Sequence, residues 1–125
     1  MKLADYFEGV NGLGILGTAD SEGKVDLAVY ARPHVIDETT IALIMSDRLS
    51  HANLQSNPSA AYLFMEQGEG YVGRRLYLTK IREETDPERI DAMRREGARH
   101  YASDSKKYLV YFRVEKVRPL VGGKA

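Results

Sequence analysis

The chain has 125 residues, enough for one domain with one hydrophobic core, and we expect residues 1–125 to form that single domain. Lysine plus arginine and aspartate plus glutamate both number 18, and this balance excludes the general positive charge typical of proteins that bind nucleic acid or an anionic membrane surface. The absence of cysteine excludes disulfides, thiolate metal sites and cysteine nucleophiles.

The first ten residues, MKLADYFEGV, include Asp5 and Glu8 and lack the apolar run of a signal peptide. No later segment approaches the length of a transmembrane helix. We therefore expect a cytoplasmic protein that does not associate with membranes.

The sequence begins with a short helix and a β-hairpin. Apolar residues at helical spacing predict a helix over residues 3–10, and Asn11-Gly12 ends it. Strands are predicted over 13–19 and 25–31. The residues between them, Asp20-Ser21-Glu22-Gly23, are typical of a tight turn.

The middle of the sequence continues with short extended segments. Arg32-Pro33 interrupts the second strand because proline has no N–H to donate to a sheet, and residues 34–36 continue that strand past the break. A further strand, TIALIM, is predicted over residues 40–45.

The second half contains three more strands and one surface helix. Strands are predicted over 59–65, 75–82 and 108–115, the last from its alternation of apolar and polar residues. Asp86-Pro87 begins a helix, with aspartate at the N-cap and proline at the first helical position. The apolar stripe of this helix consists of Ile90, Met93, Gly97 and Tyr101. The final residues, 122–125, are expected to be frayed.

These elements predict a mainly β fold of the α+β class. About six short strands at hairpin spacing favour a largely antiparallel sheet with peripheral helices, and closure into a small barrel would protect its edges.

Three motifs are better explained by structure than by chemistry. Residues 68–73 match G-x-G-x-x-G, but a strand follows instead of the helix that a dinucleotide site requires, so we interpret them as a hairpin loop. The three histidines fit no metal-ligand spacing. Asp47, Ser50 and His51 lie on one short turn without the G-x-S-x-G motif of a hydrolase.

The turn at residues 51–55 is a candidate anion site. Ser50 is a suitable N-cap for it and Asn57-Pro58 ends it, so its first N–H groups can point at a phosphate. Arg48 adds charge, and Ser50 and Asn53 add hydrogen-bonding groups. The alternative interpretation is a capped surface turn with a solvated arginine.

The second strand is a candidate ring site. Tyr30 offers an aromatic face, and Arg32 places a cation beside the rigid Pro33. A ligand with a flat ring and a phosphate tail would use this strand and the 51–55 turn together. In the alternative interpretation, Tyr30 belongs to the core and Arg32 lies in solvent.

The order of these segments resembles the pyridoxamine 5′-phosphate oxidase-like family. The similarity covers roughly residues 3–115 and rests on the DSEG turn, the strand ending near YARP, and the S-x-x-N-L-x-x-N-P pattern at residues 50–58. The length and element order are also similar to those of small FMN-binding proteins. The resemblance implies a six-stranded antiparallel split β-barrel that binds FMN.

The resemblance also implies a site. The phosphate is expected near Arg48, Leu49, Ser50 and Asn53, the isoalloxazine along residues 29–32, and the ribityl chain beside Met45 and Ser46. The implied cofactor-binding residues are Val29, Tyr30, Ala31, Arg32, Met45, Ser46, Arg48, Leu49, Ser50 and Asn53. Members of the family form homodimers with flavin in the interface. Candidate residues of the second subunit are Tyr111, Arg113, and Arg74 or Arg75.

The sequence departs from the family at Leu49, where many relatives have a lysine. This departure leaves the deazaflavin F420 as an alternative cofactor. The chain also lacks the C-terminal substrate segment of true pyridoxamine phosphate oxidases, so we do not expect that activity. The first hypothesis is an FMN-dependent oxidoreductase or electron-transfer protein with a small-molecule electron donor or acceptor. The others are a non-catalytic cofactor-binding module and a dimeric interaction module.

Overall fold

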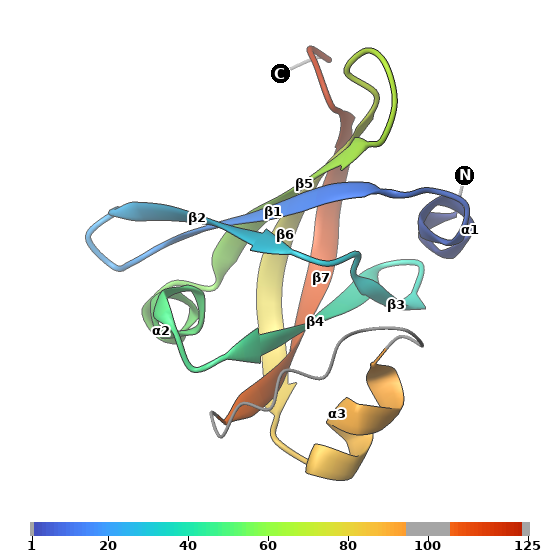
Figure 1. The fold of residues 1–125 in the computed structure, drawn as a ribbon. Helices are drawn as coiled ribbons and strands as arrows, with labels where there is room; N and C mark the ends of the chain where they lie inside the picture. The colour runs from blue at the N-terminus through green and yellow to red at the C-terminus, as the bar shows by residue number, and fades with distance from the viewer. Residues whose placement is uncertain (1, 95–105, 124–125) are drawn as a thin grey trace.

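The computed structural model describes residues 2–94 and 106–123, which form a twisted antiparallel sheet of seven strands and three helices (Figure 1). The elements are α1 (Leu3–Glu8), β1 (Gly12–Ala19), β2 (Val25–Tyr30), β3 (His34–Asp37), β4 (Thr40–Ser46), α2 (Leu49–Ser56), β5 (Ser59–Glu66), β6 (Gly73–Glu84), α3 (Pro87–Met93) and β7 (Lys107–Pro119). The mainly β, antiparallel fold class is confirmed. No helix within the described ranges is long and apolar enough to cross a membrane.

The expected number of six strands is wrong, because residues 34–37 form a strand of their own instead of continuing β2. The strand order is β2-β1-β5-β6-β7-β4-β3, so β2 and β3 lie at opposite ends of the order. Pro33 has no N–H and is fully buried where the chain passes from β2 to β3. The sheet is therefore open at these two edge strands and does not close into a complete barrel.

The hydrophobic core lies inside the curve of the sheet. Alternate residues of β4, β5, β6 and β7 point inward, β1 adds Leu16, and α1 contributes Leu3, Tyr6 and Phe7. Phe64 contacts both aromatic rings of α1 edge-on, with ring centroids 5.4 Å from Phe7 and 6.4 Å from Tyr6. A smaller cluster on the other face joins α3 to β4 and β7 through Ala42, Ile90, Leu109 and Tyr111.

The ends of the helices agree only in part with the prediction. The Asp86 cap is confirmed, since its carboxylate accepts a hydrogen bond from the Glu88 N–H at 3.0 Å. Ser50 is not an N-cap: α2 begins earlier, Arg48 occupies the cap position, and Ser50 lies inside the first turn. Helix α1 ends at Glu8, two residues earlier than expected.

The glycine-rich segment at residues 68–73 is a hairpin connection, as predicted. It joins β5 to β6, which pair antiparallel from Met65↔Gly73 onward. No helix follows these glycines, so they do not form a dinucleotide-binding turn. The Gly97 and Tyr101 positions of the expected helical stripe lie outside the described residues, as do His100 and the last two residues.

Gly14 in β1 allows a close contact that fixes the crossover from β2 to β3. A Cβ at this position would overlap both the Tyr62 hydroxyl and the Tyr30 carbonyl oxygen. The fully buried Tyr62 needs that space, because its hydroxyl donates a hydrogen bond to the Ala31 carbonyl at 2.9 Å.

We expect Gly14→Ala to lower the free energy of unfolding by about 1–3 kcal/mol, the usual cost of overpacking. Gly17→Ala in the same strand is the control, because its Cβ would meet only the movable Leu27 side chain at 3.3 Å and the Ala61 carbonyl oxygen at 3.7 Å. Urea unfolding followed by circular dichroism measures both. Equal stabilities for the two variants would contradict this account of Gly14.

Candidate functional site

A groove of about 650 Å³ lies between β2, the end of β4 and the start of α2. Segments far apart in the sequence meet here, because β2 passes close to the β4–α2 connection (Figure 1). The groove is lined by Asp26, Ala28, Val29, Tyr30, Ala31, Ile44, Ser46, Arg48, Leu49 and Ser50. Seven of the ten site residues expected from the resemblance belong to this list.

Tyr30 connects the β2 wall of the groove to α2. Its side chain packs against the core, and it lines the groove together with the buried Ser50. Burial raises the pKa of Tyr30, a hydrogen bond with Ser50 opposes the rise, and the nearby Asp26 carboxylate adds to it. Tyr30 is therefore a neutral hydroxyl at physiological pH, able to donate or accept a hydrogen bond.

Side-chain hydrogen bonds fix the backbone at the end of β2. Tyr62 holds the Ala31 carbonyl, and the Arg32 guanidinium donates to the carbonyls of Phe7 and Val10 at 2.6 and 2.9 Å. Arg32 thus ties the crossover to the C-terminal end of α1. Because its Nη1 donates to two protein carbonyls, Arg32 has a structural role. It therefore differs from the solvated side chain of the alternative interpretation.

The start of α2 carries a guanidinium, that of Arg48, beside the groove. Helix α2 has eight residues, and the N–H groups of its first turn have no partner within the helix. Among the residues that the structure describes, the Arg48 guanidinium makes no hydrogen bond or ion pair, and it lines the groove. The cation and the positive end of the helix dipole therefore favour an anion at the same place.

Three expected site residues, Arg32, Met45 and Asn53, do not line the groove, and Arg32 lines only the smaller hollow that continues it. Met45 is fully buried in the core, because residues alternate along β4 and its neighbours Ile44 and Ser46 face the groove. Asn53 is also buried, and its amide donates a hydrogen bond to the Thr18 hydroxyl at 3.0 Å, fixing α2 to β1.

A smaller hollow of about 150 Å³ continues the groove. It shares Tyr30, Ala31 and Ile44 with the groove and adds Arg32, His34, Leu43 and Arg94. Its apolar walls and its cations suit the polar edge of a flat ring. The sequence did not reveal Arg94 as a site residue, because only the packing of α3 against the sheet brings it near Tyr30.

The sequence did not indicate that Lys107 lies near the groove. It pairs with Ser46 across β4 and β7, and its ammonium donates a hydrogen bond to the Ser46 hydroxyl at 2.7 Å. A strand pairing between residues so far apart leaves no signal in the sequence.

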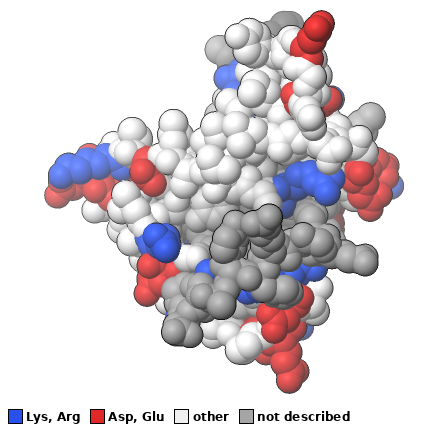
Figure 2. Space-filling model, viewed as in Figure 1, with Lys and Arg blue, Asp and Glu red and all other residues white. Residues whose placement is uncertain are grey.

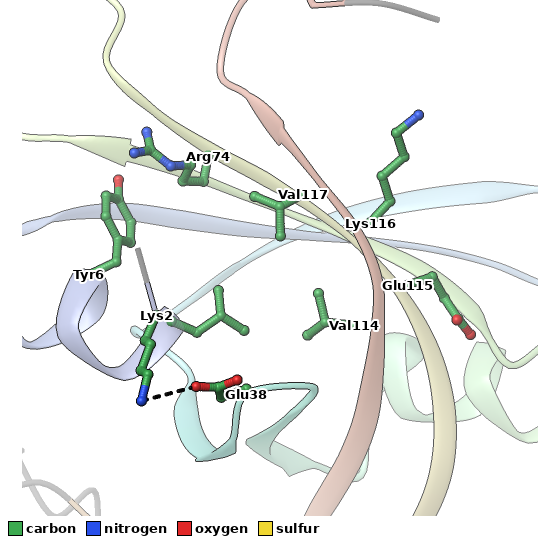
Figure 3. Close-up of a pocket in the computed structure, with 9 residues that line it drawn as sticks. Lys2, Tyr6, Glu38, Arg74, Val114, Glu115, Lys116 and Val117 are labelled. Carbon is green, nitrogen blue, oxygen red and sulfur yellow. Dashed lines mark ion pairs between the residues drawn. The ribbon is translucent and has the colours of Figure 1, made fainter.

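A separate hollow of about 640 Å³ lies between α1 and β7 (Figure 3). Lys2 pairs with Glu38 across its mouth at 3.3 Å, and the Arg74 guanidinium stacks on the Tyr6 ring at 4.5 Å. Burial, and then a hydrogen bond to Glu66, raises the pKa of Tyr6 to about 12. Helix α1 begins at this hollow, but it has only six residues and its cap residue Lys2 is already paired with Glu38. Glu115 also lines the hollow, so it suits a phosphate less well than the groove.

The residues expected from a second subunit lie away from the groove. Arg74 belongs to the hollow beside α1, and Arg75 donates to the carbonyls of Pro119 and Gly122. Tyr111 lies in the cluster beneath α3, and Arg113 pairs with Glu115 at 2.9 Å.

A charged cluster on the far side of α2 holds this helix in place. The buried His51 ring stacks on Tyr108 with centroids 3.7 Å apart, and its Nε2 lies 3.0 Å from the Glu83 carboxylate. Burial alone would raise the pKa of Glu83, but hydrogen bonds from Lys80, Gln55 and His51 outweigh it and lower the pKa to about 2. The His51 Nε2 pairs with Glu83 and its Nδ1 lies 3.9 Å from the Asp47 carboxylate, whereas Ser50 lines the groove.

Comparison with solved structures identifies the fold. An FMN-binding protein from Syntrophomonas wolfei subsp. wolfei superposes with a TM-score of 0.75 and 20% identity, covering 94% of this chain and 82% of its own. A pyridoxinephosphate oxidase family protein from Clostridium acetobutylicum, related to general stress protein 26, has a TM-score of 0.70 and 15% identity, with 93% and 83% covered. The chain has the pyridoxamine 5′-phosphate oxidase-like fold.

An F420 reductase shares this fold as well, with a TM-score of 0.70 and 13% identity over 86% of this chain and 89% of its own. No protein-family model matches the chain, and no curated protein matches it significantly. At these identities the likeness establishes the pyridoxamine 5′-phosphate oxidase-like fold alone and does not extend to the ligand or the reaction.

We expect Glu83→Gln to change the acid stability of the protein. The pKa of Glu83 in the folded state is about 2, below its ordinary value of 4.5, so the ionised carboxylate stabilises the fold. This contribution is complete above about pH 4.5 and is lost as the pH falls toward 2. Between these pH values the wild type should lose about 1–2 kcal/mol more stability than the variant, since solvent screens part of the interaction.

Glu69→Gln, in the exposed β5–β6 loop, is the control for the removal of one carboxylate. Thermal unfolding at several pH values between 2 and 6 measures all three proteins. Parallel pH profiles for the wild type and Glu83→Gln would contradict a stabilising role of the Glu83 cluster.

Proposed function

We propose that the chain is a homodimeric flavoprotein that binds FMN in the groove and passes electrons between a small-molecule donor and acceptor. The observation that carries the proposal is the Arg48 guanidinium, which lines the groove at the start of α2 without a partner among the described residues. Such a cation, beside unpaired helix N–H groups, suits a phosphate. The neighbouring apolar hollow at Tyr30 suits a ring joined to it.

The residues of the groove fit FMN in their donor chemistry. Arg48, Ser50 and the Ser46 hydroxyl would hold the phosphate, while Asp26 offers a carboxylate to the ribityl hydroxyls. The backbone at Ala31, fixed by Tyr62, would support the ring. Bound FMN supplies the redox chemistry, and these residues bind it, orient it and limit its contact with water.

An apolar sheet face beside the groove supports a homodimer. Val25, Leu27 and Val29 of β2 have 82%, 72% and 70% of their surfaces exposed. The same face continues through Ile15 of β1 to Leu63 of β5, which are register partners. Figure 2 shows a broad uncharged surface in the middle of this view, where β1 and β2 lie in Figure 1. Contiguous exposed apolar surface is typical of an interface, and Val29 belongs to both this face and the groove.

We expect Arg48→Gln to weaken FMN binding about tenfold or more while riboflavin binding stays unchanged, because riboflavin lacks the phosphate that Arg48 would contact. Arg89→Gln on the surface of α3 is the control for the loss of one guanidinium. Quenching of flavin fluorescence on titration of the apo-protein gives the dissociation constants. Titration with F420 tests the alternative cofactor.

Equal wild-type affinities for FMN and riboflavin would contradict the phosphate site. If FMN binds, adding NADH or NADPH without oxygen separates two roles: loss of the visible flavin band indicates an oxidoreductase, and an unchanged band with these and other donors favours a non-catalytic cofactor-binding module. A protein that binds neither FMN nor F420 would favour a dimeric interaction module.

We expect Leu27→Glu to convert a dimer into a monomer, because a carboxylate in an apolar interface must lose its hydration. The FMN affinity of this monomeric variant should be lower by about fivefold or more if a second copy completes the groove. Light scattering during size-exclusion chromatography measures the mass. Ile36→Glu, on the exposed surface of β3, is the control. A wild-type protein that is monomeric at all concentrations would contradict the dimer.

A further inference from the structure

Among the described residues, the groove lining contains one cation, whereas the proposed ligand carries nearly two negative charges. A phosphate monoester at pH 7 has a charge of about −1.5 to −2. Arg48 is the cation among the lining residues, and Asp26 on the opposite wall has the same sign as the phosphate. Leu49, next to Arg48, is uncharged and 56% exposed, so it adds nothing to the binding of an anion.

Lys107 lies where a second cation is needed. The antiparallel pairing of β4 and β7 makes Ser46 and Lys107 direct cross-strand partners, whose side chains share one face of the sheet. Ser46 lines the groove on that face, and the Lys107 ammonium is 2.7 Å from its hydroxyl. The positive charge is thus one hydrogen bond away from the groove.

The hydrogen bond from Lys107 also determines what Ser46 can offer. A hydroxyl that accepts a bond from an ammonium keeps its own proton to donate. Ser46 can therefore donate its own proton to an oxygen in the groove. Because both side chains are half-buried, water screens the ammonium less than it screens an exposed lysine.

We propose that Lys107 supplies the second positive charge of the phosphate site, directly and through the polarised hydroxyl of Ser46. The inference rests on the proposed function, since it presumes that the groove holds a phosphate. It assigns a role to a residue on β7 of the same chain, far in sequence from Arg48 and Ser50.

The test compares two adjacent lysines. Lys107→Gln and Lys106→Gln remove the same charge from neighbouring positions, but Lys106 is exposed and its ammonium lies 5.4 Å from the centre of the Tyr108 ring. We expect Lys107→Gln to weaken FMN binding about tenfold, with riboflavin binding unchanged, and Lys106→Gln to change FMN binding less than twofold. Lys107→Arg, which keeps the charge, should restore most of the affinity.

Salt provides an independent measurement on the same proteins. The dependence of FMN affinity on sodium chloride concentration should be weaker in Lys107→Gln than in Lys106→Gln, because one cation fewer acts on the phosphate. Ser46→Ala serves as the second variant if Lys107→Gln does not fold, as judged by circular dichroism. It leaves the lysine in place, removes the hydroxyl, and should weaken FMN binding about threefold to fivefold.

The outcomes distinguish this inference from the proposed function. If the wild type binds FMN no more tightly than riboflavin, the phosphate site itself is absent and both proposals fail. If the wild type prefers FMN, but Lys107→Gln and Lys106→Gln have the same FMN-to-riboflavin affinity ratio, the role of Lys107 alone is overturned. If only Ser46→Ala can be measured, an unchanged ratio in that variant overturns it.

Discussion

The hydrogen bond from the Tyr62 hydroxyl to the Ala31 carbonyl is the contact on which the arrangement of this molecule depends. At Ala31 the chain leaves one edge strand, and three residues later, at His34, it begins the strand at the other end of the sheet. Pro33 prevents β2 from continuing, and Arg32 fastens the crossover to the carbonyls that end α1. One buried phenol, one guanidinium and one proline therefore fix the edges of the sheet, the position of α1 and the wall of the groove.

The faces of the strands explain how a small domain accommodates both a core and a ligand groove. Along β4, Ile41, Leu43 and Met45 point into the core, while Ile44 and Ser46 face the groove. Helix α2 likewise has residues that contact the core and residues that face the groove. Leu54 and Asn53 hold it to the sheet, His51 holds it to Glu83 and Tyr108, and its first turn remains open to the groove. The groove is thus lined by residues whose neighbours are fixed by the core.

The sequence predicted those parts of the fold that depend on neighbouring residues. The Asp20–Gly23 turn, the Asp86 cap and the glycine-rich hairpin are local signals, and the structure confirms them. The separate strand at His34–Asp37 was missed because its partner, β4, is set by the crossover and not by the local pattern. Ser50 is a typical cap residue by type, but α2 begins at Leu49 and Arg48 occupies the cap position without a side-chain hydrogen bond.

The residues expected at the site lie in one region of the fold, although not all of their side chains face the groove. A resemblance transfers positions along the chain, so Val29 to Ala31 and Arg48 to Ser50 arrive at one groove. It does not transfer the direction of a side chain: Met45 alternates into the core, Asn53 binds Thr18, and Arg32 binds the end of α1. Lys107 and Arg94 reach the site through long-range pairing and packing, which no local pattern encodes.

Val29 lies at the boundary between the exposed face of β2 and the groove, and this position has a thermodynamic consequence. A ligand bound at this boundary and a second chain packed on the same strand would contact each other, so each would add to the contact surface available to the other. Their binding equilibria are then linked, so that each strengthens the other. Dilution of the protein would release the ligand even at constant ligand concentration, and saturation with ligand would keep the two chains together at concentrations where the empty protein separates.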